Sequence, residues 1–178
     1  MSDSDAALVA RTLDGDLDAY GVLMARYRDQ FGRYAFHMLG NREDAQEAMQ
    51  DSFVRAYRAL QDCRQPDRFG AWLFRIVVNR CRTLRRRLIR YRRFDGELPD
   101  EVPVADPAPA SFEWREEIGR ALGQLRPHYR EAFLLRYVEG LEYSEMSRMT
   151  GAREAALRMR VKRAGDQLRR LLRDVHAG

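Results

Sequence analysis

Four polar side chains suited to nucleic-acid binding recur at intervals of three and four residues between positions 69 and 93. They are Arg75, Asn79, Arg82 and Arg86, and at about 100° per residue they fall in one narrow band of a helix. Arginine binds phosphate through its planar guanidinium, and asparagine can pair bidentately with a base edge. Because residues 80–93 hold eight arginines, we predict a nucleic-acid contact here rather than an ordinary solvated face.

A second basic pattern lies between residues 129 and 164, YREAFLLRYVEGLEYSEMSRMTGAREAALRMRVKRA, which is typical of a helix-turn-helix. Helices over 143–149 and 153–173 are joined through Gly151, although such pairs also occur as plain structural corners. The predicted buried stripe of the second helix is Leu157, Val161, Ala164, Leu168 and Leu172. Since the N-terminal part of this helix enters the major groove, the candidate contacts are Arg153, Arg158, Met159, Arg160, Lys162 and Arg163.

Apolar residues recur at helical spacing almost throughout, and no alternating strand pattern competes with them. We therefore predict an all-α protein of two small helical domains, over residues 1–94 and 112–178. Residues 95–111 are predicted to be a flexible, acidic, proline-rich linker, because they hold four of the six prolines and little to bury. In the second domain, helices over about 112–124 and 128–138 precede the helix-turn-helix.

The first domain is predicted to contain three long helices, over about 17–38, 43–60 and 69–93, with a loop over 61–68. Asp67 is a plausible cap for the last of them. The residues expected to face the core are Leu17, Tyr20, Leu23, Met24, Tyr27, Phe31, Tyr34, Met38, Ala45, Met49, Phe53, Ala56, Tyr57, Leu60, Phe69, Leu73, Ile76, Val77, Leu84 and Leu88.

The net charge of +5 is distributed in the same three blocks: +6 over residues 1–94, −5 over 95–111 and +4 over 112–178. This arrangement favours a polyanion that is bound by the two ends and avoided by the middle. An extended linker of this length reaches about 55 Å, or about 16 base pairs. Tethering two weak contacts within that reach raises avidity roughly 10²–10⁴-fold.

The remaining composition disfavours an enzyme or a membrane protein. The cysteines, Cys63 and Cys81, and the histidines, His37, His128 and His176, lack metal-ligand spacing, so we predict no metal, no cofactor and reduced thiols. The N-terminus MSDSDAALV lacks a signal-peptide pattern. No apolar run approaches the roughly 20 residues of a membrane-spanning helix. We expect a soluble, cytoplasmic chain.

The segment FGAWLFRIVVNRCRTLRRR resembles the promoter −10 recognition helix of bacterial sigma factors, specifically the extracytoplasmic-function (ECF) class. LDGDLDAYGVLMARY resembles the opening helix of that family. In the family, the loop between the second and third helices captures a flipped promoter base, which implies this role for residues 61–68. Extruding a base costs a few kcal/mol. The implied −10 contacts are Phe69, Trp72, Arg75, Asn79, Arg80, Arg82 and Arg86, although core packing is the favoured alternative for Trp72 and for Phe74.

The segment REDAQEAMQDSFVRAYRAL resembles the region of the same family that docks on the β′ coiled coil of RNA polymerase. Its outward arc carries acidic residues, which would repel phosphate, and an exposed Val54. The resemblance implies polymerase contacts by Asp44, Glu47, Gln50, Asp51 and Phe53. Gln46 and Glu47 stand where the family more often has Glu and Asp.

LRPHYREAFLLRYVEGLEYSEMSRMTG resembles the −35-binding domain of these sigma factors, so the helix-turn-helix candidates become −35 contacts. The following AALRMR departs from the usual Gly-Thr-Val-Lys-Ser-Arg, because Ala156 and Met159 replace two hydroxyl side chains. Ala155 and Met159 are expected to point outward, where they could meet thymine methyls or a protein partner. Thr83, where the family usually has Asp, is a second departure.

The main hypothesis is therefore a sigma factor that binds core RNA polymerase and reads both promoter elements, with the second domain also contacting the β flap. A polymerase-independent helix-turn-helix regulator is the alternative, although residues 1–94 show no sensor pocket or dimerisation seam. A nuclease is the third possibility, and the chain lacks a carboxylate cluster with metal-site spacing. Family members are often held by anti-sigma proteins, which makes such a protein a further candidate partner.

Overall fold

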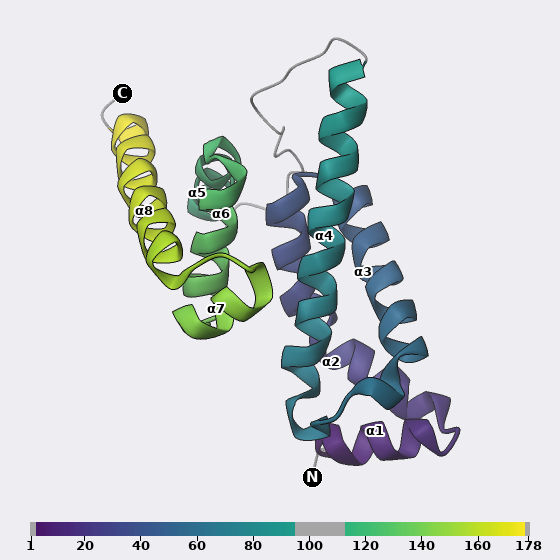
Figure 1. The fold of residues 1–178 in the computed structure, drawn as a ribbon. Coiled ribbons are helices and arrows are strands. Elements are labelled where there is room, and N and C mark those ends of the chain that lie inside the picture. The colour runs from purple at the N-terminus through teal and green to yellow at the C-terminus, as the bar shows by residue number, and fades with distance from the viewer. Residues whose placement is uncertain (1–2, 95–112, 177–178) are drawn as a thin grey trace. The chain divides into compact units, whose positions relative to one another are not determined.

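The computed structural model describes residues 3–94 and 113–176 (Figure 1), and the regular structure in these ranges is helical, without a strand. This confirms the all-α prediction. The chain divides into two compact units, Met1–Glu97 and Leu98–Gly178, each of which is described by itself below. The linker predicted over 95–111 lies outside the described residues.

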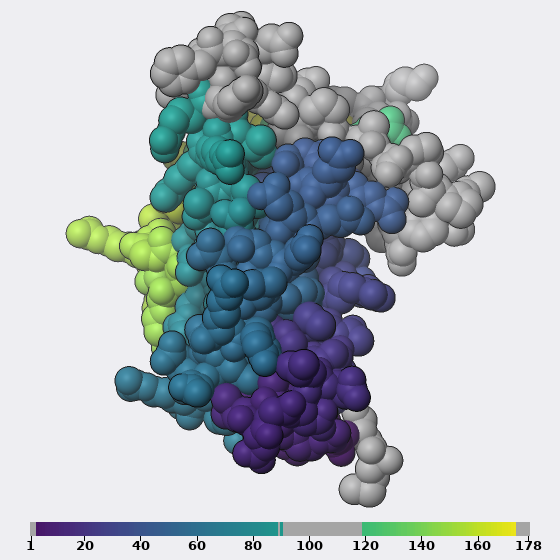
Figure 2. All heavy atoms as spheres, turned by 90° about the vertical axis from the view of Figure 1, so that its right-hand side faces the viewer, coloured from purple at the N-terminus to yellow at the C-terminus, as the bar shows by residue number. Residues whose placement is uncertain are grey.

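Unit 1 is a bundle of three long helices with a short helix across one end. Its elements are α1 (Asp5–Leu13), α2 (Leu17–Leu39), α3 (Arg42–Arg58), two 3₁₀ turns, η1 (Leu60–Asp62) and η2 (Pro66–Arg68), and α4 (Phe69–Phe94). Helices α2, α3 and α4 pack against one another, and α1 contacts the turns that lead from α3 into α4. Figure 2 shows α3 in blue along the bundle and α1 in purple at its end.

Local signals in the sequence explain where the helices of unit 1 begin and end. The side chain of Asp16 accepts the Ala19 N–H at 3.1 Å, which satisfies an otherwise unpaired donor at the start of α2. Asn41 caps α3 in the same way, at 2.7 Å from the Asp44 nitrogen. Between these helices, Gly40 adopts φ 84°, a left-handed conformation that glycine reaches without a steric penalty. These caps fix the two long helices close to their predicted bounds.

The core of unit 1 contains most of the predicted residues, with two corrections. Leu17 is 63% exposed and Tyr57 is 43% exposed, so the prediction that both face the core was wrong. Leu17 is the first residue of α2 and lies at the rim of the bundle, whereas the Tyr57 ring lies against Tyr20 with centroids 5.1 Å apart. The predicted residues found buried are Tyr20, Leu23, Phe31, Tyr34, Met38, Ala45, Met49, Ala56, Leu60, Phe69, Leu73, Val77 and Leu84.

Unit 2 contains the helix-turn-helix at its predicted place. Its elements are α5 (Glu113–Gln124), α6 (Pro127–Phe133), a turn of π-helix, η3 (Leu134–Val138), α7 (Tyr143–Thr150) and α8 (Glu154–His176). Gly151 ends α7 with φ 70°, and a capping box of Glu142 and Glu145 begins that helix. The predicted stripe of α8 is buried from Leu157 to Leu168, while Leu172 is half-buried.

Arg130 joins α5 to α6 from inside unit 2. Its side chain is only 1% exposed, and its guanidinium donates to the carbonyl of Gly123 and, at 3.3 Å, to that of Leu125. These carbonyls lie at the end of α5, where they have no partner within the helix. An arginine that the sequence left unassigned is thus a structural cap.

Candidate nucleic-acid interfaces

The outer side of α4 presents the predicted band of polar residues. Arg75, Asn79 and Arg86 are exposed, and Arg82 is half-buried. Their spacing of three and four residues keeps them on one side of the helix. Thr83 lies beside this band, and its hydroxyl donates to the Asn79 carbonyl at 2.9 Å. The Asn79 amide remains on the exposed side, where a base edge could reach it.

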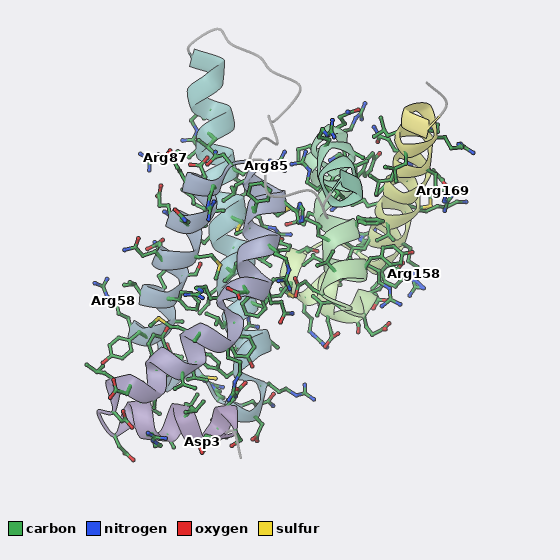
Figure 3. All side chains as sticks on the ribbon, turned by 180° about the vertical axis from the view of Figure 1, so that it is seen from behind. Asp3, Arg58, Arg85, Arg87, Arg158 and Arg169 are labelled. Atoms are coloured by element: carbon green, nitrogen blue, oxygen red, sulfur yellow. The ribbon has the colours of Figure 1, made fainter. Side chains whose placement is uncertain are left out.

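Positive charge continues toward the end of α4, where Figure 3 labels Arg85 and Arg87. Arg87 is exposed and Arg85 is half-buried. The helix itself contains no acidic residue. Any acidic partner of its arginines must therefore come from another element, and α3 supplies two.

A groove of about 590 Å³ lies between the end of α3 and the middle of α4. Ile76 and Ala59 supply apolar surface within it, and Asn79 lies on its α4 side. This combination of apolar surface and a few polar groups is typical of ligand sites of this size. Ala59, which lines the groove, lies two residues before the predicted base-capturing segment 61–68 in the sequence, but no residue of that segment is part of the lining. The residues that line it are Asp51, Arg55, Arg58, Ala59, Ile76, Asn79, Arg80 and Thr83.

Arg80 connects two surfaces that the sequence assigned to different partners. Its guanidinium lies 2.6 Å from a carboxylate oxygen of Asp51 and 3.1 Å from one of Glu47. Its side chain is 17% exposed, and Asp51 also pairs with Arg55 at 2.8 Å. The sequence predicts a DNA contact for Arg80 and polymerase contacts for both acids. In this structure they neutralise one another across the α3–α4 interface, so Arg80 is not a free cation on the DNA-facing side.

Phe69 does not belong to a DNA-facing surface. Its side chain is fully buried, with ring centroids 5.9 Å from Tyr27 and 5.8 Å from the half-buried Trp72. The prediction of a direct contact by Phe69 is therefore corrected to core packing. The next residue, Gly70, explains the close approach: a Cβ there would lie 2.7 Å from the Tyr27 ring. Asp5 accepts a hydrogen bond from the Tyr27 hydroxyl, which ties α1 to α2.

The predicted polymerase face of α3 is only partly available. Glu47 and Gln50 are exposed, whereas Phe53 is half-buried and its carbonyl accepts the Tyr20 hydroxyl at 2.6 Å. Asp44 is half-buried in the cap of α3, where it accepts a hydrogen bond from the Asn41 amide. Sequence reasoning expected Val54 to be exposed, and it is 42% exposed.

In unit 2 the predicted −35 candidates lie on the outer surface of α8 and at Arg153, directly before this helix. Five of them are exposed, and the sixth, Arg160, is half-buried. Met159 is 50% exposed, as the outward projection predicted. Figure 3 labels Arg158 and Arg169 on this helix. The exposed candidates are Arg153, Arg158, Met159, Lys162 and Arg163.

Tyr143 of α7 is a contact that sequence reasoning missed. The guanidinium of Arg158 lies 4.9 Å from the centroid of its ring, and that of Arg136 lies 5.2 Å from it. Arg158 also pairs with Glu154 at 2.9 Å, and Arg136 pairs with Glu142 at the same distance. The aromatic residue at the start of α7 could have signalled this, because cations often stack on tyrosine. The stacking orients Arg158 from the first helix of the motif.

Within residues 3–94 and 113–176, no group of three or more His, Cys, Asp or Glu side chains is placed to hold a metal ion. Among the same residues, no helix is both long and apolar enough to cross a membrane.

Two sigma-70 family models match the chain, one in each unit. Residues 23–91 match sigma-70 region 2, and residues 115–168 match sigma-70 region 4. The first match includes α3 and α4 almost completely, and the second includes the helix-turn-helix.

Individual proteins give the same result. The chain is 34% identical to the ECF RNA polymerase sigma factor SigM of Mycobacterium tuberculosis, over 98% of this chain and 88% of that protein. It is 33% identical to the ECF RNA polymerase sigma factor SigE of Mycolicibacterium smegmatis, over 86% of this chain and 61% of that longer protein. The solved structure of CnrH in complex with the cytosolic domain of CnrY has a TM-score of 0.68 and 29% identity, covering 97% of this chain and 99% of that one.

Proposed function

The chain belongs to the sigma-70 family, in the class of ECF RNA polymerase sigma factors, and from this premise we propose which surfaces perform each task. As a sigma factor it binds core RNA polymerase, recognises the −10 and −35 promoter elements and initiates transcription. We assign polymerase docking and −10 recognition to residues 1–94 and −35 recognition to residues 112–178, with residues 95–111 as the linker.

The outer side of α4 contacts the −10 element, and the groove beside it holds an extruded base. The single observation that carries this assignment is the position of Asn79, which is both exposed on α4 and part of the groove wall. Phosphates of the same strand would lie along Arg75, Arg82 and Arg86. A base in the groove would meet Ile76 on an apolar surface and the Asn79 amide at its edge. Interactions of this kind offset the few kcal/mol needed to extrude a base.

Polymerase docks on the exposed part of α3, with Glu47 and Gln50 as the accessible polar contacts. Asp51 and Asp44 contribute less directly, because Asp51 already pairs with Arg80 and Arg55, and Asp44 is held in the helix cap. The exposed Val54 and Tyr57 supply apolar area on the same helix. Acidic residues mixed with apolar ones suit a protein partner better than phosphate.

The −35 element is read by Arg153, directly before α8, and by the first half of α8, with Arg158 and Lys162 among the contacts. Arg158 is oriented by Tyr143, which reduces the conformational freedom that it loses on binding. The same unit contacts the β flap of polymerase. CnrH forms a complex with the cytosolic domain of CnrY, and this likeness supports the anti-sigma protein expected from the sequence as a partner here. The chain acts in the cytoplasm with polymerase and has no enzymatic activity of its own.

Reconstituted transcription tests this assignment. Transcript 5′ ends sequenced after overexpression define the promoters, and holoenzyme is then assayed on one of them. We expect Asn79→Ala to reduce open-complex formation by about 10–100-fold, since a bidentate base contact is worth about 1–3 kcal/mol. An abasic nucleotide at the extruded position should reduce open-complex formation by a similar factor. The variant and the abasic nucleotide together should reduce it little further, because both remove the same contact.

Two controls make the result specific. Asp29→Ala replaces an exposed residue on α2, outside every assigned surface, and should leave transcription unchanged. Polymerase binding, measured by pull-down, should be normal in Asn79→Ala. Strictly additive losses from the variant and the abasic site would contradict the base-holding role of the groove.

A further inference from the structure

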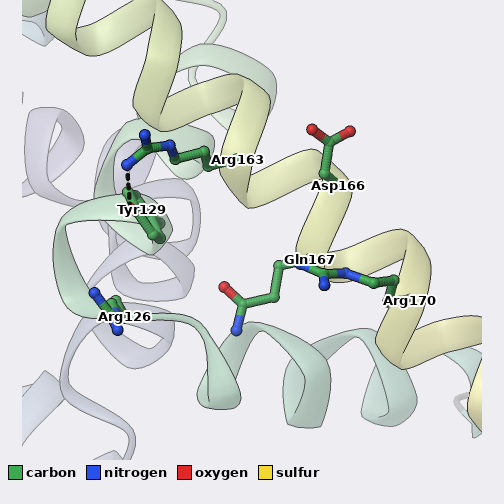
Figure 4. A pocket seen from close by; sticks show the side chains of 6 residues that line it. All are labelled: Arg126, Tyr129, Arg163, Asp166, Gln167 and Arg170. Carbon is green, nitrogen blue, oxygen red and sulfur yellow. Dashed lines mark hydrogen bonds between the residues drawn. The ribbon is translucent and has the colours of Figure 1, made fainter.

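A second hollow, of about 450 Å³, opens between the start of α6 and the middle of α8 in unit 2 (Figure 4). Only Arg163 among its lining residues belongs to the candidates taken from the sequence. The lining residues are Arg126, Tyr129, Arg163, Asp166, Gln167 and Arg170. The hollow is open to solvent, so a ligand attached to a larger molecule could enter it.

Positive charge dominates this hollow. Three of its lining residues are arginines and one is acidic, and that residue, Asp166, already pairs with Arg169 at 2.8 Å. Within the part of the chain that the structure describes, neither Arg126 nor Arg170 forms an ion pair. Among the described residues, two guanidinium groups thus face one opening without an ion-pair partner.

The third arginine is held in place by a hydrogen bond. Arg163 donates to the Tyr129 hydroxyl at 3.1 Å, shown as a dashed line in Figure 4. This bond occupies one of the five N–H donors of the guanidinium, so several remain for an anion. A cation fixed by a neutral partner keeps its charge for a ligand and loses little conformational freedom on binding.

His128, next to the hollow, responds to the same positive field. Burial lowers the pKa of its imidazole, and the charges of Arg160 and Arg126 lower that pKa further. The direction of this shift is the one expected where cations outnumber acids.

We propose that this hollow is a phosphate pocket, formed by Arg126, Tyr129, Arg163, Gln167 and Arg170, which binds a backbone phosphate of duplex DNA beside the −35 element. The proposal rests on the function proposed above. Arg163 belongs both to the −35 candidates and to the pocket. Gln167 and Arg170 lie about 6 and 10.5 Å farther along α8, at 1.5 Å per residue.

The geometry of the motif explains why the ligand is a phosphate and not a base. A recognition helix enters the major groove by its N-terminal part, so the later turns of α8 leave the base edges and approach the backbone. Arg126 reaches the same opening from the start of α6. A phosphate held from two helices fixes the register of the domain on the duplex without reading sequence.

The test compares two pairs of substitutions in full-length protein assembled with core polymerase. The pocket variant is Arg126→Gln with Arg170→Gln, and the control is Arg120→Gln with Arg173→Gln, which removes two exposed arginines of the same unit outside the pocket. Promoter affinity is measured over a range of salt concentrations. We expect the pocket variant to lose about 3–30-fold in affinity at low salt, with a salt slope shallower by about 0.9 for one lost phosphate contact.

A second readout locates the phosphate. Neutral methylphosphonate groups are introduced one at a time along the backbone around the −35 element. At one position the neutral group should lower the promoter affinity of wild type and of the control variant. It should not lower the affinity of the pocket variant, because that variant already lacks the phosphate contact. Inorganic pyrophosphate serves as the probe for a free ligand. It should displace promoter DNA from wild type only at concentrations that also displace DNA from the control variant.

The outcomes separate the pocket from the proposed function. If wild-type holoenzyme does not initiate at any start site, the proposed function fails. If it initiates normally and the pocket variant keeps full affinity and slope, the phosphate pocket alone is refuted. A loss of affinity confined to particular −35 sequences would indicate that the pocket reads bases, and it would also refute the phosphate pocket. Tight binding of pyrophosphate would refute it as well, if no methylphosphonate position affects wild type and the pocket variant differently.

Discussion

Helices α4 and α8 have similar length and are both rich in arginine, but α4 contains no acidic residue and α8 contains three. The structure uses their arginines differently. On α4, Arg80 is paired with two acids of a neighbouring helix and borders a groove shared with that helix. On α8, the ion pairs of Arg158 and Arg169 are made with acids of α8 itself. A basic helix packed beside an acidic one can form a pocket between two elements. A basic helix that satisfies these charges locally leaves its other arginines available, as with Arg163 and Arg170 at the open hollow beside α6.

The largest effect is expected on α4, from replacing Arg75, Asn79 and Arg82 together with alanine. Loss of phosphate and base contacts should reduce run-off transcription by about 100-fold or more, while polymerase binding remains intact. Replacing the exposed Arg28 and Arg33 of α2 with alanine is the matched control and should leave transcription close to wild type. Loss of polymerase binding in the α4 variant would mean that the two faces of unit 1 are exchanged.

Charge reversal on α3 should weaken polymerase binding, which the α4 substitutions leave intact. Glu47→Lys with Asp51→Lys is expected to weaken polymerase binding about 10-fold or more, because like charges at an interface are strongly unfavourable. Glu43→Lys changes an exposed acid of the same helix outside the assigned surface and serves as the control. Circular dichroism checks that α3 still folds. Unchanged polymerase affinity in a folded variant would refute the docking surface.

The surfaces of α3 and α4 show which features can be predicted from the sequence and which cannot. Features that follow from the spacing of apolar residues along a single helix were predicted well. They are the bounds of α2, α3 and α8, the exposure of Val54 and Met159, and the buried stripe that begins at Leu157. A single period fixes these features because they need no knowledge of a neighbour.

Features that depend on a second element were missed or misassigned. The partner of Arg80 on α3, Glu47, lies 33 residues away in sequence, so no local pattern reveals the pair. Helix α1 is nine residues long, which is short for recognition by periodicity, although Ser4 is a typical N-cap. Phe69 was correctly placed in the core by its spacing and wrongly retained among the DNA contacts by family resemblance.

Glycine substitutions distinguish how tightly the two basic helices are packed. In α4, Gly70→Ala would push a Cβ into the Tyr27 ring and should destabilise the protein by about 1–3 kcal/mol. In α8, the Cβ of Gly165→Ala would meet only the end of Arg169 at 3.7 Å, so helix propensity should stabilise that variant by about 0.5–1 kcal/mol. Denaturation followed by circular dichroism measures both. Equal effects would mean that Tyr27 moves aside freely.

The smallest effects come from the ion pairs. A double-mutant cycle on Asp51 and Arg80 should give a coupling on the order of 1 kcal/mol, because this pair is partly buried between helices. The matching cycle on Glu154 and Arg158 should give about 0.3–0.5 kcal/mol, the range for exposed pairs four residues apart. Equal coupling energies would mean that the ion pair between α3 and α4 is no stronger than the exposed pair within α8.

The most direct test of the α4 groove is photo-crosslinking in the open complex. A photoreactive base is placed at successive positions of the non-template −10 strand, and the crosslinked residues are identified by mass spectrometry. We predict that one position alone crosslinks to the groove, at Ala59 or between Ile76 and Asn79, while its neighbours crosslink to the outer side of α4. Crosslinks that never reach the groove from any position would contradict the account.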